Sequence, residues 1–111
     1  AIAHGIGNAT LEWMQYDENA QPLTTNFGEY LLPVATDVPH ADVVHLETPS
    51  PLNPLGVKGA GEGGTIPAAA AIVSAIENAL AEYRLNLTRS PTVPQHVFEE
   101  LRAAGAYGDT P

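Results

Sequence analysis

The sequence contains no cysteine and very little positive charge. Without cysteine, the chain cannot form disulfides or supply thiolates to catalysis, zinc knuckles or iron–sulfur clusters. Lysine and arginine together number 4 against 13 acidic residues, so the net charge is -9, and residues 1–57 hold none of the four. Nucleic acids and anionic membrane surfaces are bound through several cations. The composition therefore argues against both of these partners.

Long apolar runs are also missing. No stretch approaches the roughly 20 apolar residues that span a bilayer, and the first residues lack the basic and apolar regions of a signal peptide. We expect a soluble, cytoplasmic protein without a membrane span. With 111 residues, 44% of them hydrophobic, the chain has the size of one domain at most. It opens on Ala1 inside a helical pattern and not on Met, so we expect a fragment of a longer polypeptide.

Hydrophobic periodicity predicts three helices, because apolar residues recur at every third or fourth position. The predicted helices cover residues 2–14, 66–84 and 94–104. Thr92 and Gln95 resemble a capping box at the start of the last one, and Gly105 ends it. We expect the tail after Gly105 to be irregular.

Turns, loops and one strand are predicted between the first two helices. Residues 16–22 have the composition of a turn, and the three prolines of residues 49–54 indicate a stiff loop. Over residues 42–48, Val44 and Leu46 alternate with polar and β-branched neighbours, which is typical of a half-buried strand. The predicted fold class is therefore α+β, with a helix, short strands and loop, then two helices.

Two segments contain glycine in an unusual place or number, and the first is the opening helix, where glycine is unfavourable. Gly5 and Gly7 each cost about 1 kcal/mol relative to alanine inside a helix. Two readings account for them. Either the helix frays at its start, or a ligand or another backbone approaches it closely.

The second place is the segment from Gly56 to Gly64, where five of nine residues are glycine. A glycine-rich loop that leads into a helix offers free N–H groups and the positive end of the helix dipole. Glu62 lies within it, and a carboxylate there would repel a phosphate. The same surroundings suit a carboxylate kept ionised as a general base, with Lys58 near enough in sequence to orient it or a ligand.

Other readings of this loop stay open from the residues alone. Gly59, Gly61 and Gly64 match the dinucleotide pattern G-x-G-x-x-G, but the predicted strand ends about ten residues too early, and Glu82 lies in a predicted helix. The phosphate-loop pattern is absent because the lysine precedes the glycines. The loop can also serve as a non-enzymatic anion or nucleotide site, or as a structural or interaction element that lets the helix dock.

A family resemblance adds to this reading. The stretch TPSPLNPLGVKGAGEGGTIP, residues 48–67, with the alanine-rich helix after it, resembles the C-terminal region of the molybdopterin-binding large subunits of molybdenum hydroxylases. This is the family of xanthine dehydrogenase, aldehyde oxidase and aerobic carbon monoxide dehydrogenase. AHGIG at residues 3–7, LE at 11–12, YDEN at 16–19 and YLLP at 30–33 agree in order. The resemblance covers nearly the whole chain, so residues 1–111 are expected to form the C-terminal portion of the molybdopterin-binding domain.

The resemblance implies roles for particular residues. Glu62 matches the glutamate that acts as a base beside the molybdenum and activates water for attack on an electrophilic substrate carbon. The remaining matched positions are expected to contact the cofactor: His4, Gly5, Gly7, Lys58, Gly59, Ala60, Gly61 and Gly63. Many members carry Gln where this chain has His4, so His4 either donates the same hydrogen bond or is only a helix-start histidine. No residue of the chain is expected to ligate the metal.

The resemblance also implies the surroundings of the chain. The expected cofactor is a molybdenum-pterin, as molybdopterin or its cytosine dinucleotide, while FAD and [2Fe-2S] clusters belong to a medium and a small partner subunit. The upstream part of the same large subunit completes the site, so the isolated chain is expected to be inactive. The substrate is a small molecule: an aldehyde, an N-heterocycle or CO. His40, His45 and His96 are expected at the surface, without a metal.

Overall fold

The computed structural model describes residues 1–108 and consists of three helices joined by long irregular segments. α1 spans Ile2–Thr10, α2 spans Ala68–Ala79 and is followed by a single 3₁₀ turn, η1, at Ala81–Tyr83, and α3 spans Pro94–Ala103. All three predicted helices are confirmed, each with a shift of its ends. The last three residues of the expected irregular tail lie outside the described residues.

α1 ends four residues earlier than its periodicity predicts. Leu11 leaves the helical conformation, and the N–H groups of both Leu11 and Glu12 bond to the carbonyl of Gly7. The apolar residues beyond that point serve other contacts. Trp13 packs edge-on against His96, with ring centroids 4.8 Å apart, and the sulfur of Met14 accepts a hydrogen bond from Thr24. The apolar pattern therefore continues past the helix for reasons of tertiary packing.

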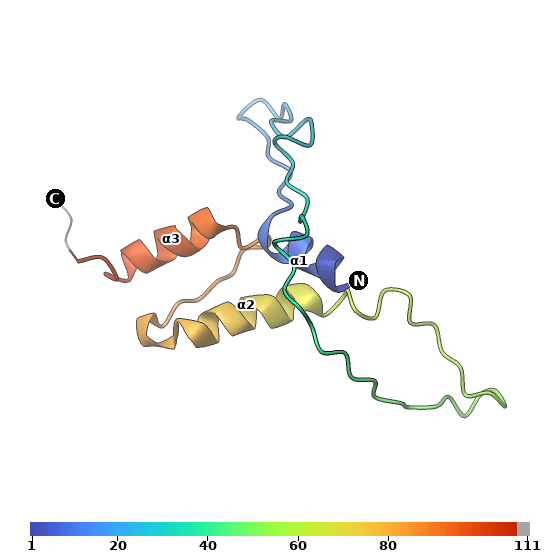
Figure 1. The fold of residues 1–111 in the computed structure, drawn as a ribbon. Coiled ribbons are helices and arrows are strands. Elements are labelled where there is room, and N and C mark those ends of the chain that lie inside the picture. Colours follow the sequence, from blue (N-terminus) through green and yellow to red (C-terminus); the bar gives the residue numbers. More distant parts are fainter. Residues whose placement is uncertain (109–111) are drawn as a thin grey trace.

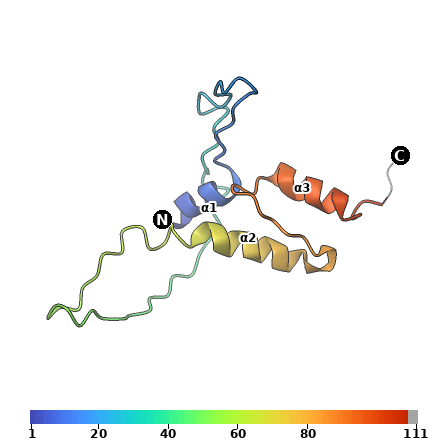
Figure 2. The ribbon, with the colours of Figure 1, turned by 180° about the vertical axis from the view of Figure 1, so that it is seen from behind.

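The crossing of α1 and α2 is the one extensive contact between helices in residues 1–108 (Figures 1 and 2). Gly5 makes it possible, because a Cβ atom at this position would collide with the Cβ of Ala68. Gly7 is also confined, since its Cβ would lie 2.5 Å from Oε2 of Glu12 and 2.9 Å from Cδ of Pro33. The helix already begins at Ile2, and other parts of the chain approach both glycines closely, so fraying does not account for them.

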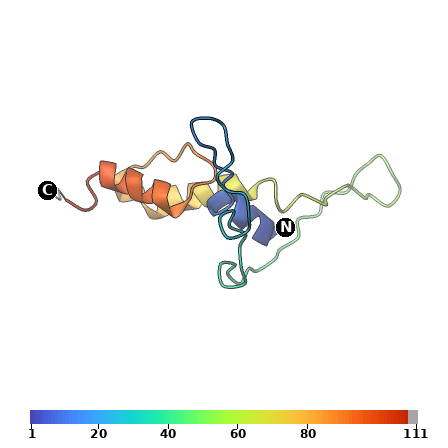
Figure 3. The same ribbon diagram turned by 90° about the horizontal axis from the view of Figure 1, so that it is seen from above.

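Three arms leave this crossing in different directions (Figure 1). One holds residues 13–32, whose predicted turn forms around the carboxylate of Asp17, which accepts the N–H groups of Asn19 and Gln21. The second holds α2 and α3. The third is a long loop over residues 38–66, and Figure 3 shows that it extends away from the end that carries α2 and α3.

The predicted strand over residues 42–48 does not form. These residues are exposed, and the single β-type pairing in residues 1–108 is an isolated bridge between Tyr16 and Pro22. A strand needs a hydrogen-bonded neighbour, and no backbone hydrogen bond joins residues 42–48 to another described segment. The β part of the predicted α+β class is therefore not confirmed.

Two further sequence interpretations near α3 are wrong. Thr92 does not form a capping box, because its hydroxyl donates to the carbonyl of Arg89 and the helix begins after Val93 without a side-chain cap. His96 is not at the surface but buried, with 9% of its area exposed, because Trp13 from beyond α1 covers it. Such a contact between distant segments leaves no local pattern in the sequence.

The described chain has almost no core of its own. Ala9 is the sole buried hydrophobic residue among those described, while Val44, Leu46 and Leu52 are each more than 80% exposed. The radius of gyration is 18.2 Å, against about 13 Å for a compact domain of this length. No helix in residues 1–108 is long and apolar enough to cross a bilayer.

The contact between Gly5 and Ala68 yields a test of the fold. Gly5→Ala should lower stability by about 1–2 kcal/mol, because overpacking at a backbone contact outweighs the gain of about 1 kcal/mol in helix propensity. Ala68→Gly in the same protein should restore most of the loss, and Asn8→Ala, on the exposed side of α1, should be neutral or better. Thermal unfolding followed by circular dichroism measures all three, and a stabilised Gly5→Ala variant would contradict this packing.

Candidate functional site

The glycine-rich segment, residues 56–64, runs from the tip of the long loop back to α2, and its two ends have different surroundings. The end nearer α2 lies against the start of α1. A Cβ at Gly64 would be 2.8 Å from the Cβ of Ala1, and the Thr65 hydroxyl donates to the Ala1 carbonyl at 3.4 Å. The helix crossing therefore fixes the position of this end.

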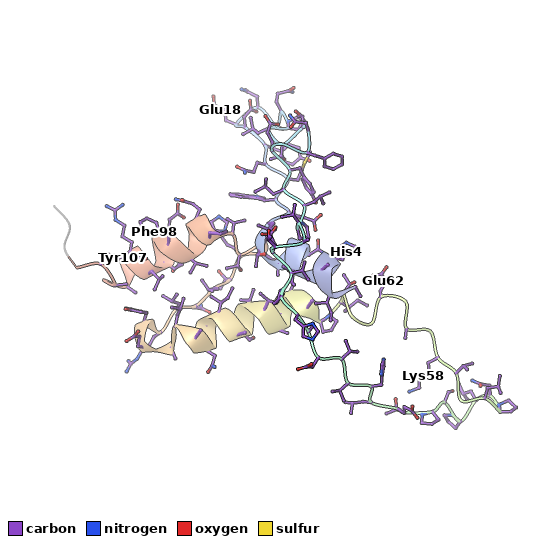
Figure 4. The ribbon with its side chains drawn as sticks, in the orientation of Figure 1. His4, Glu18, Lys58, Glu62, Phe98 and Tyr107 are labelled. Carbon is purple, nitrogen blue, oxygen red and sulfur yellow. The ribbon has the colours of Figure 1, made fainter. Side chains whose placement is uncertain are left out.

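Glu62 lies in a tight turn directly before α2. Its carbonyl accepts the N–H groups of Thr65 at 3.0 Å and Ile66 at 3.1 Å, and Gly63 N–H bonds to the Ala60 carbonyl at 3.2 Å. The side chain is exposed, and no other residue in the described part of the chain bonds to its carboxylate. Figure 4 shows it on the same side of the molecule as His4, at the end where both helices begin. The main chain thus holds an unpaired carboxylate at the crossing.

The other end of the segment, at the loop tip, is held by Asn53. Its side-chain amide donates to the Val57 carbonyl at 3.0 Å, and its side-chain oxygen accepts the Val57 N–H at 3.1 Å. Ser50 N–H bonds to the carbonyl of Gly56, which has a φ of +67° and lies against Pro49. Asn53 was not among the predicted site residues, although an asparagine in a proline-rich loop, three residues before a glycine, is typical of side chains that close turns.

Lys58 is separated from Glu62, contrary to the hypothesis that it orients this carboxylate. Its ammonium group donates to the hydroxyl of Thr48 at 2.6 Å, which ties the two limbs of the loop together near the tip. In Figure 4 the two labelled side chains lie far apart along the loop. Lys58, Gly59 and Ala60 instead line a shallow pocket together with residues 46–49 and 55–57.

The glycines of the two predicted groups differ in what surrounds them. Gly5 and Gly7 face protein atoms at close range, so packing explains why neither carries a side chain. Gly59 and Gly61 have nothing within 4 Å of the position of an added Cβ, and neither has a positive φ. Nothing in residues 1–108 therefore requires glycine at these two positions. The open space at both positions leaves room for a bound group to approach the main chain closely.

Glu12 joins α1 to the arm of residues 13–32, because its carboxylate accepts a hydrogen bond from the Tyr30 hydroxyl at 3.2 Å. Burial raises the pKa of Tyr30, and the charge and hydrogen bond of Glu12 raise it further. The neutral phenol is thus the stable form, and the stability that it contributes is lost only as the pH rises through this raised pKa.

The described residues contain no group of three side chains able to hold a metal ion. His40 and Asp42 form a weak pair at 3.9 Å, both almost fully exposed. The dinucleotide reading of the glycines also lacks its framework, since no strand precedes the loop in residues 1–108 and Glu82 lies in η1. Residues 1–108 therefore supply no ligand set for a metal by themselves.

Comparisons with known proteins agree with the sequence resemblance. Residues 1–39 match the family model of a molybdopterin cofactor-binding domain. The chain is 46% identical to the gamma subunit of the 6-hydroxypseudooxynicotine dehydrogenase complex of Paenarthrobacter nicotinovorans, over 92% of this chain and 13% of that protein. It is 36% identical to the nicotine 6-hydroxylase large subunit of the same organism, over 91% of this chain and 12% of that protein.

A solved structure has the same fold. The chain superimposes on quinoline 2-oxidoreductase from Pseudomonas putida 86 with a TM-score of 0.85 and 42% identity, covering 91% of this chain and 13% of that one. The chain thus spans about one eighth of the length of each of these relatives. The three arms are therefore a shape that recurs within a much larger protein.

Asn53 offers a test of the loop geometry. Asn53→Ala removes both side-chain bonds to Val57, each contributing about 1 kcal/mol, and should speed amide exchange over residues 50–58. Asn53→Asp keeps the acceptor but loses the donor. Its exchange rates should lie between those of the wild type and of Asn53→Ala, and exceed those of Asn53→Ala only where the carboxylate repels the Val57 carbonyl. Asn86→Ala, at an exposed position after η1, is the control and should leave exchange in this loop unchanged. Unchanged exchange in Asn53→Ala would contradict the assigned bonds.

Proposed function

Because the chain belongs to the molybdenum hydroxylase family and corresponds to a C-terminal segment of its large subunits, we propose that it supplies the catalytic base of such an enzyme. The proposed reaction hydroxylates a substrate carbon with oxygen from water. The proposed substrate class is the N-heterocycles, since two of the relatives are named for nicotine and quinoline, which both contain a ring nitrogen. A non-enzymatic anion or nucleotide module is not favoured by these relatives.

The unpaired carboxylate of Glu62 carries the proposal. A general base must be ionised, free of a competing cation and held within reach of the proton that it removes. The turn at residues 60–66 holds the main chain of Glu62, while its side chain stays free of partners in the described structure. Lys58, which would have competed for it, bonds to Thr48 instead. Glu62 accordingly takes the proton from the attacking water.

The residues around Glu62 fit a bulky cofactor. When bound, the molybdenum-pterin supplies the two-electron redox chemistry that side chains cannot. The open faces of Gly59 and Gly61, with Ala60 and Gly63 between and after them, leave the main chain free for contact. At the start of α1 the exposed side chain of His4 is available, whereas Gly5 and Gly7 let α1 lie close to α2 and Pro33. Lys58 would contact the cofactor only from the loop tip.

The upstream part of the same large subunit completes the site in this proposal. In this proposal, a medium subunit with FAD and a small subunit with [2Fe-2S] clusters carry the electrons away, as the family resemblance implies. The proposed location is the cytoplasm. The isolated chain is expected to be inactive, since residues 1–108 have almost no core of their own.

Replacement of Glu62 tests the proposed role. In the complete enzyme, Glu62→Gln keeps the shape of the side chain but removes its basicity, so turnover should fall by about 10²–10⁴-fold. Molybdenum content, measured by plasma mass spectrometry, should stay nearly unchanged, because no metal ligand is lost. Glu82→Gln, at an exposed position in η1 beyond the far end of α2, should retain wild-type turnover.

The two measurements separate the possible outcomes. Preserved turnover in Glu62→Gln would remove Glu62 from the mechanism. Lost turnover with lost molybdenum would assign the residue to cofactor retention and not to proton transfer.

A further inference from the structure

One limb of the long loop, residues 42–48, has the properties of a strand without its neighbour. The limb extends away from the helices on the far side of the crossing from α3 (Figures 1 and 3). Every residue of it is exposed, with Val44 at 82% and Leu46 at 92%. Isolated extended chain of this composition is not stable in water by itself.

The main chain of this limb is free to pair. Within the described residues, backbone hydrogen bonds end at Asp37 and resume at Ser50, and the one bond to the limb is that of Lys58 to the Thr48 hydroxyl. Its N–H and C=O groups must form hydrogen bonds wherever the limb is buried. An extended segment with a free edge satisfies them by adding to another strand.

The side chains show which face would be covered. Val44 and Leu46 project from one face of an extended chain, while Val43, His45 and Glu47 project from the other. A two-residue period of this kind is typical of a strand with one face buried in a core and the other face exposed to solvent. The apolar face thus needs a hydrophobic layer that the 108 described residues do not supply.

The exposed area identifies the source of that layer. The accessible surface of 8591 Å² exceeds by roughly 2,800 Å² the value of about 5,800 Å² for a compact domain of this mass. A second copy in a standard dimer would cover only about 800 Å² per partner. The excess is spread over all three arms, so a large body that surrounds them accounts for it better than one flat interface.

We propose that residues 42–48 form a β-strand in the assembled protein by pairing with a strand from the part of the large subunit outside these 111 residues. Val44 and Leu46 then face its hydrophobic core. This inference rests on the proposed function, because it takes the chain as part of a larger subunit. The segment leading to Glu62 would be anchored through this strand at its far side, as the helix crossing anchors it at the near side.

Hydrogen exchange with residue-level resolution on the full-length large subunit tests the pairing. If a strand pairs on one edge, every second amide of residues 42–48 should exchange roughly 100-fold or more slowly than in the unfolded chain. The protection should already be present in the large subunit purified without its partner subunits. Fast exchange throughout would overturn the inference, and so would protection that appears only when another subunit or a second copy binds.

Two neighbouring valines provide a matched pair of variants. Val44→Asp places a carboxylate on the covered face and should lower the yield of folded large subunit roughly tenfold or more, whereas Val43→Asp should stay within about twofold of the wild type. Equal effects of the two substitutions would contradict the assigned face. A protected limb together with preserved turnover of Glu62→Gln would overturn the proposed function while leaving this inference intact.

Discussion

The close approach of α1 to α2 is the constraint on which the rest of the structure depends. Gly5 has no side chain, so Ala68 can lie directly against the backbone of α1. The same approach places Gly64 and Thr65 against Ala1, which sets the end of the glycine-rich segment beside the first turn of α1. Glu62 owes its position to a contact between residues more than sixty positions apart.

The chain otherwise depends on its surroundings. Seventeen large hydrophobic residues are exposed and none of comparable size is fully buried among residues 1–108. Local bonds hold each arm in shape, through Asp17 in the first arm and Asn53 in the long loop. These bonds fix turns but bury little apolar area, and burial is the main source of stability in folding. The arms thus keep their shape through local bonds, without a core of their own.

The sequence predicted what depends on local chemistry. Helical periodicity located α1, α2 and α3, and the acidic turn after Tyr16 formed where its composition indicated. It could not predict where α1 ends, because the packing of Trp13 on His96 joins distant segments. The strand predicted over residues 42–48 has the right alternation, but it does not form, because no described segment pairs with it. Glu62 and Lys58 are four residues apart in sequence, yet the extended loop between them holds them apart in space.

The central claim is that the carboxylate of Glu62 stands beside the molybdenum. Anomalous diffraction at the molybdenum absorption edge, from crystals of the assembled enzyme, locates the metal without reference to any assumed mechanism. The account predicts one peak next to the Glu62 carboxylate, on the face shared by His4 and the start of α2. A peak nearer to Lys58 at the loop tip, or an enzyme that contains no molybdenum, would contradict it.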